Sequence, residues 1–126
     1  MTEETVKKIL IADDEEAYRM LLANGLVDAG FLVLQAKDGN EALRLAKEEH
    51  PDIVLLDIKM PGRDGIEILD ELYKELGDNV PIFMLTQMSD MDTIAKAASK
   101  HALGYFIKSE HPIEYMVEQV KKRLYK

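Results

Sequence analysis

The chain has 126 residues, of which 47% are hydrophobic and 32% are charged, and its formal net charge is −8 at pH 7. This length suits one globular domain with a sizeable core, and the acidic balance argues against direct binding of nucleic acid, which requires clustered Lys and Arg. The absence of cysteine excludes disulfide scaffolds and cysteine zinc sites; because no apolar stretch approaches the roughly 20 residues that cross a bilayer, we expect no membrane insertion and a cytoplasmic location.

Short apolar runs alternate along the chain with segments of helical periodicity. The runs are rich in leucine and β-branched residues without polar alternation, which is typical of parallel strands buried on both faces. In chain order, we expect a strand at residues 9–12, a helix over 18–29, a strand at 31–36, a helix over 39–49, a strand at 53–56, a helix over 66–76, a strand at 81–85, a helix over 91–98, a strand at 103–107 and a helix over 112–124.

Five strands that alternate with five helices predict an α/β fold, a single (βα)5 doubly wound five-stranded parallel sheet. Gly30 should end the first helix, and Pro112 should occupy the first position of the fifth. Right-handed crossovers would place helices on both faces of the sheet. We expect residues 1–126 to form one domain with its core at about 7–124, and no second domain.

Four of the predicted strands end on residues that can take part in chemistry. Asp13 and Asp14 follow the first strand, Asp57 the third, Thr86 the fourth and Lys108 the fifth. In an open parallel sheet, ligands bind beyond the carboxyl ends of the strands. Three carboxylates, a hydroxyl and an ammonium would therefore converge at one edge, and this set suits a divalent cation and a phosphoryl group.

Magnesium, or manganese in its place, is the expected cofactor because it takes carboxylate oxygens, waters and substrate phosphate. We expect Asp14 and Asp57 to be direct ligands, together with the backbone carbonyl of Lys59, and Asp13 to act through a bound water. Two carboxylates about 5 Å apart repel by roughly 3 kcal/mol at an effective dielectric constant near 20, so the cluster requires a compensating cation. Each aspartate taken singly could be a solvated loop residue; their combination with Lys108 predicts a site.

Asp57 is the candidate nucleophile, since it follows the most apolar strand and a carboxylate beside magnesium can form an aspartyl phosphate. The metal and Lys108 would neutralise charge on the phosphoryl oxygens. Thr86 could donate its hydroxyl to a phosphoryl oxygen. The residues therefore predict phosphoryl transfer to the protein itself.

From about Lys7 to Leu124, the chain resembles the receiver domain of bacterial two-component response regulators, of the chemotaxis-regulator-like kind. The order and spacing of the matching motifs are highly specific, although each motif alone is weak. They are Asp13-Asp14, Asp57 followed by Met60-Pro61-Gly62 and Asp64-Gly65, Thr86, Tyr105 and Lys108, with support from Asp38-Gly39 and Glu41-Ala42-Leu43. The resemblance implies the flavodoxin-like strand order 2-1-3-4-5.

The resemblance also implies a function. Asp57 would accept a phosphoryl group from a sensor histidine kinase or phosphotransfer protein, and the receiver would catalyse this step on itself without turning over an external substrate. Asp13, Asp14 and Asp57 would form the magnesium site. Thr86 and Lys108 would contact the phosphoryl group, and Thr86 would move together with Tyr105. The surface of the fourth helix, fifth strand and fifth helix would then change to control an unknown protein target; a phosphorylation-dependent dimer stays open, and no output domain is expected.

Three residues depart from the family pattern. Ser109 follows Lys108, where the family usually has proline in a cis peptide, so either a cis bond costing roughly 2.5 to 4 kcal/mol is kept or the loop takes another path. Gln87 replaces a usually small residue, and Lys59 stands at a variable position. We expect the lifetime of the phosphoryl group to be altered.

A degenerate receiver that acts as a constitutive protein-interaction module is the main alternative. A flavodoxin-like cofactor binder is disfavoured because the acidic stretch at residues 13–16 would repel a flavin phosphate. A phosphatase acting on external substrates would need an inserted segment to build a substrate pocket, and the sequence has none.

Overall fold

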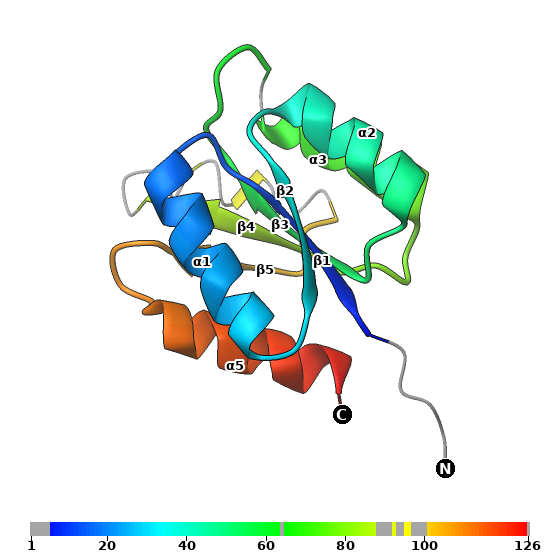
Figure 1. The fold of residues 1–126 in the computed structure, drawn as a ribbon. Coiled ribbons are helices and arrows are strands. Elements are labelled where there is room, and N and C mark those ends of the chain that lie inside the picture. The colour runs from blue at the N-terminus through cyan, green and yellow to red at the C-terminus, as the bar shows by residue number, and fades with distance from the viewer. Residues whose placement is uncertain (1–5, 64, 88–91, 93–94, 97–100, 126) are drawn as a thin grey trace.

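The computed structural model, which describes residues 6–63, 65–87, 92, 95–96 and 101–125, contains a five-stranded parallel sheet in the order β2-β1-β3-β4-β5 (Figure 1). The strands are β1 (Lys8–Ala12), β2 (Leu32–Ala36), β3 (Ile53–Asp57), β4 (Ile82–Thr86) and β5 (Gly104–Ile107). The predicted α/β fold and its strand order are therefore confirmed.

Helices cover both faces of this sheet, as expected for right-handed crossovers. The helices with defined bounds are α1 (Glu16–Asp28), α2 (Gly39–Glu49), α3 (Gly65–Leu76) and α5 (Ile113–Leu124). Figure 1 shows α1 beside α5 on one face and α2 beside α3 on the other. Met91, Ile94 and Ala98, which mark the predicted fourth helix, lie outside the described residues. None of the described helices is long and apolar enough to span a membrane.

The core is divided by the sheet into two apolar layers, because successive side chains of a strand point to opposite faces. Leu10, Val54 and Leu56 pack toward α2 and α3, whereas Ile11 and Leu55 pack toward α1 and α5. All five residues of the central strand β3 are buried. This explains why β3 reads as a continuous apolar run, and it places the end of β3 in the middle of the sheet edge.

Local sequence signals set most element boundaries. Asp38 caps α2 through its carboxylate, which accepts a hydrogen bond from the Glu41 N–H at 2.8 Å. Gly30, with φ of 99°, follows the end of α1 as predicted. The prediction for Pro112 was wrong by one position: it is the N-cap of α5, since its ψ of 156° is extended and the helix begins at Ile113.

The loop between β3 and α3 passes unusually close to the strand that it leaves. A Cβ atom added to Gly65, the first residue of α3, would lie 2.2 Å from the backbone oxygen of Ile58. Gly39, the first residue of α2, is also crowded, but there the added atom would meet the flexible side-chain end of Ile68, with Cδ1 at 2.5 Å. Only the first contact requires the backbone to move.

We therefore predict that Gly65→Ala lowers the free energy of unfolding by about 2 kcal/mol or more, because a backbone clash next to the end of β3 cannot be relieved by a side-chain rotation. Gly39→Ala is the matched control and should cost less, since the Ile68 side chain can rotate. Urea unfolding of both variants measures the difference. An equal or smaller loss for Gly65→Ala would contradict the prediction.

Candidate metal and phosphoacceptor site

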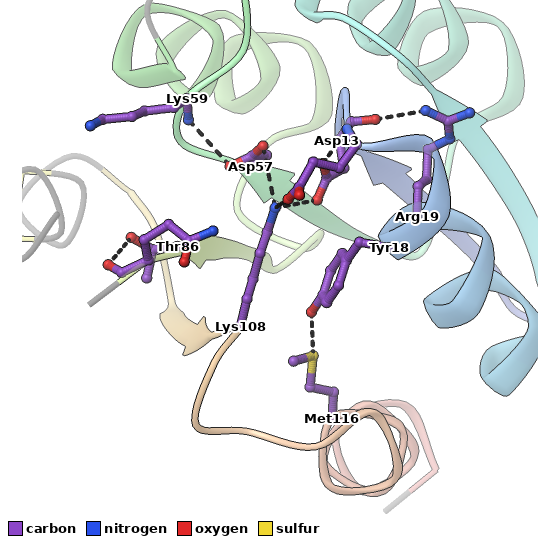
Figure 2. Close-up of polar contacts among 10 residues, drawn as sticks. Asp13, Tyr18, Arg19, Asp57, Lys59, Thr86, Lys108 and Met116 are labelled. Carbon is purple, nitrogen blue, oxygen red and sulfur yellow. Dashed lines mark hydrogen bonds and ion pairs between the residues drawn. The ribbon is translucent and has the colours of Figure 1, made fainter. Parts of the chain in front are cut away.

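The sheet brings together the polar residues predicted to converge at its carboxyl edge (Figure 2). Asp13 continues from β1, and Asp57 ends the adjacent strand β3. Thr86 ends β4 and is paired in register with Ile107 of β5, so the following residue, Lys108, lies beside it and donates its N–H to the Thr86 carbonyl at 2.8 Å. The convergence follows from parallel pairing of strands of similar length.

Three aspartates form an acidic cluster at this edge. Asp13, Asp14 and Asp57 each have one carboxylate oxygen within 4.8 Å of those of the other two. Asp14 is exposed, whereas Asp13 is 0% and Asp57 6% exposed. Oxygens of this number and spacing suit a hard divalent cation, and the exposed Asp14 marks the side from which solvent reaches the cluster.

The carboxylates are only partly satisfied by hydrogen bonds. Asp13 Oδ1 accepts the N–H of Glu15 at 2.8 Å, and Asp57 Oδ1 accepts the N–H of Lys59 at 3.3 Å. Asp13 Oδ2 is buried and has no hydrogen-bond partner of normal geometry among the described residues. Clustered carboxylates, two of them buried, are costly unless positive charge compensates them, so the cluster fits a bound divalent ion.

Lys108 is the cation closest to the acidic cluster within the described chain. Its Nζ lies 2.7 Å from Asp13 Oδ2 and 3.5 Å from Asp57 Oδ2, and its side chain is 7% exposed. Figure 2 shows it reaching toward both aspartates from the end of β5. This ammonium lowers the charge imbalance of the cluster, but one positive charge faces three carboxylates here.

Burial and neighbouring charges shift the pKa values of Asp57 and Lys108. Burial and the neighbouring charge of Asp13 raise the pKa of Asp57 from 3.8 to about 7, against the opposing effects of Lys108 and the Lys59 N–H. Burial lowers the pKa of Lys108, but contacts with Asp13 and Glu15 outweigh it and hold that pKa above its ordinary value. Lys108 is therefore charged at neutral pH, and one ammonium faces a larger negative charge.

Tyr18 of α1 packs against Lys108, a contact that apolar spacing did not predict. Lys108 Nζ lies 4.7 Å from the centre of the Tyr18 ring, within the range of a cation–π interaction. Burial raises the pKa of Tyr18 to about 12, so its hydroxyl keeps its proton and donates to Met116 Sδ of α5 at 3.4 Å (Figure 2). The helical periodicity predicted Tyr18 to be a core residue; its ring also contacts the Lys108 ammonium.

Thr86 and Tyr105 lie on neighbouring strands at the β4–β5 side of the site. Thr86 is buried, and its hydroxyl donates to the Gln87 carbonyl at 3.0 Å. Tyr105 is 41% exposed and pairs in register with Met84. The hydroxyl bond to the Gln87 carbonyl is a different interaction from the predicted one with a phosphoryl group, and the predicted coupling of Thr86 to Tyr105 stays a prediction.

The loop after β5 reaches its conformation without a cis peptide. Every peptide bond among the described residues is trans, which includes the bond between Lys108 and Ser109. His111 closes the loop: its Nδ1 accepts the N–H of Ile107 at 2.8 Å, and its own N–H donates to the Ile107 carbonyl at 2.8 Å. Of the two possibilities for this loop, the structure therefore has the alternative path, and Lys108 still reaches the cluster.

Comparisons with known proteins agree with this geometry. The family model for the response regulator receiver domain matches residues 9–121. The chain is 38% identical over 118 residues to sporulation initiation phosphotransferase F of Bacillus subtilis (strain 168), covering 94% of each chain. It is 39% identical over 120 residues to the probable transcriptional regulator ycf27 of Porphyridium aerugineum, covering 94% of this chain but 49% of that protein.

Solved structures give the same result. The chain superposes on a CheY-like response regulator receiver domain protein of Methanospirillum hungatei JF-1 with a TM-score of 0.88 and 27% identity, covering 95% of this chain and 94% of the other. It spans about half the length of the ycf27 regulators, so what those whole proteins do is not transferred to it. The sequence match, the strand order and the acidic edge together show that the chain belongs to the response regulator receiver domain family.

Proposed function

We propose that this receiver domain is a phosphorylation-activated switch of a two-component system, in which Asp57 accepts a phosphoryl group from a phosphohistidine on a sensor kinase or phosphotransfer protein. The proposal rests above all on one observation: Asp57 is buried at the end of the central strand, within an acidic cluster and 3.5 Å from the Lys108 ammonium. The family membership supports the same role.

Asp13, Asp14 and Asp57 would hold a magnesium ion, or manganese in its place, together with the backbone carbonyl of Lys59. Three carboxylates gather around one lysine ammonium among the described residues, and the raised pKa of Asp57 indicates the same excess of negative charge. When bound, the ion would supply positive charge that stabilises the oxygens of the transferring phosphoryl group.

In the transfer, one carboxylate oxygen of Asp57 attacks phosphorus, the P–N bond of the phosphohistidine breaks, and the imidazole nitrogen leaves with the bonding electrons. Lys108 is positioned to bind a phosphoryl oxygen, since its ammonium is already directed at the Asp57 carboxylate. Thr86 would exchange its bond to the Gln87 carbonyl for one to the phosphoryl group. The inward movement of Thr86 would leave space for the exposed Tyr105 to turn inward, which alters the surface formed by β5 and α5.

Phosphate uptake is the first test. Incubation with acetyl phosphate and magnesium should add one phosphate per chain by intact mass, and Asp57→Asn should remain unmodified because it lacks the attacking oxygen. Asp28→Asn is a matched control, since Asp28 is exposed at the opposite end of α1 and its loss changes the net charge equally. Phosphate on Asp57→Asn at the wild-type yield would refute the proposal.

Metal binding is the second test. Magnesium at about ten times its Kd should raise the free energy of unfolding of the unmodified protein by about 1.4 kcal/mol, since it binds only the folded state. Asp14→Asn removes a cluster oxygen and should abolish most of this gain, whereas Asp28→Asn should retain it. Thermal unfolding with magnesium and with EDTA measures both. A full gain in Asp14→Asn would contradict the assigned site.

The third test uses the raised pKa of Asp57 in metal-free protein. Between pH 3.8 and about pH 7, Asp57 keeps its proton in the folded state and releases it in the unfolded state. The folded state therefore loses stability as the pH rises through this window. Relative to Asp57→Asn, the wild type in EDTA should therefore lose about 1 to 2 kcal/mol between about pH 5.5 and pH 8. Urea unfolding across this range measures the difference, and parallel pH profiles would contradict the charge imbalance.

A further inference from the structure

The ammonium of Lys108 contacts three carboxylates that differ in burial. Besides the ion pairs with Asp13 and Asp57, Lys108 Nζ donates a hydrogen bond of 3.0 Å to Glu15 Oε1. This distance is close to the 2.7 Å that separates the ammonium from Asp13 Oδ2. Lys108 therefore also binds a carboxylate outside the acidic cluster.

The Glu15 carboxylate is free to move away from Lys108, whereas the two aspartates are not. Its side chain is 58% exposed, whereas Asp13 and Asp57 are buried. Its backbone N–H is fixed by Asp13 Oδ1 at 2.8 Å, and its carbonyl accepts the N–H of Arg19 in the first turn of α1 at 2.9 Å. The Glu15 carboxylate can thus swing into solvent by rotating its side chain, while the start of α1 stays in place.

Lys108, in contrast, has a side chain that is only 7% exposed. The Tyr18 ring lies against the ammonium at 4.7 Å, and the Tyr18 hydroxyl is anchored to Met116 of α5. A lysine ammonium has three N–H donors, and the nitrogen here lies 2.7 Å from Asp13, 3.0 Å from Glu15 and 3.5 Å from Asp57. A phosphoryl oxygen arriving on Asp57 needs one of these donors, and Glu15 holds the one that can be given up without disturbing the cluster.

We propose that Glu15 determines how readily this receiver is phosphorylated, because its carboxylate competes with the incoming phosphoryl group for the Lys108 ammonium. This inference rests on the proposed phosphorylation of Asp57. In the unphosphorylated protein, the Glu15–Lys108 bond occupies the phosphoryl contact. On phosphorylation, a phosphoryl oxygen takes over that donor and the Glu15 side chain is released at the N-terminal end of α1.

The experiment measures the initial rate of phosphorylation by acetyl phosphate with magnesium, followed by intact mass. Glu15→Gln keeps the shape of the side chain but weakens its hold on the ammonium, and it should increase the rate by about three- to tenfold. Glu15→Asp keeps the charge but is one methylene too short for the same contact, so it should also be faster than the wild type. Both effects should disappear in a Lys108→Met background.

Glu16→Gln is the matched control. Glu16 is the adjacent residue, it is exposed, and it pairs with Arg19 rather than Lys108, so its substitution removes the same charge without touching the contact. Its rate should stay within about twofold of the wild type, as for an ordinary surface charge.

The outcomes separate the two proposals. If wild-type protein is phosphorylated but Glu15→Gln is no faster than Glu16→Gln, the competition is overturned while the proposed function stands. If Glu15→Gln and Glu16→Gln are equally accelerated and Glu15→Asp is unchanged, long-range charge explains the rates and the competition is again overturned. If the wild type takes up no phosphate on Asp57, both proposals are refuted.

Discussion

The excess of negative charge at the carboxyl edge of the sheet is the constraint on which the site depends. Asp13, which follows β1, and Asp57, which ends β3, are both buried, and within the described part of the chain one lysine ammonium contacts them. Burial makes each additional charge expensive, which is visible in the raised pKa of Asp57. The proposed cation and the proposed phosphoacceptor carboxylate both rest on this one imbalance, because the described residues leave an excess of negative charge at this edge.

Lys108 connects the parts of the molecule that must respond together. It begins the loop after β5, its ammonium contacts residues that follow β1 and end β3, and its charge lies on a ring from α1 that is bonded to α5. The proposed phosphoryl contact is therefore linked to α1 and α5 through the side chain of Lys108. This arrangement explains how a local change of charge could reach the β5–α5 surface without a long chain of intermediates.

The sequence predicts the position of this site better than its internal contacts. Buried parallel strands have a clear signature, and parallel pairing brings their ends to one edge, so Asp13, Asp57, Thr86 and Lys108 could be located from spacing alone. The bond between Lys108 and Glu15 joins residues 93 positions apart and depends on side-chain rotamers, which periodicity does not encode. For the same reason, the ring contact of Tyr18 and the path of the loop at Ser109 required the folded structure.

Because Gly65 lies close to the Ile58 carbonyl, the α3 side of the site has little room for added volume. On the α3 side, backbone lies against backbone immediately after Asp57, so added volume there meets a wall. On the β4–β5 side, the Lys108 ammonium lies 3.5 Å from Asp57, and the adjacent strand β4 ends on Thr86, whose hydroxyl can change its hydrogen-bond partner. A bulky group on Asp57 would therefore meet more resistance on the α3 side than on the β4–β5 side.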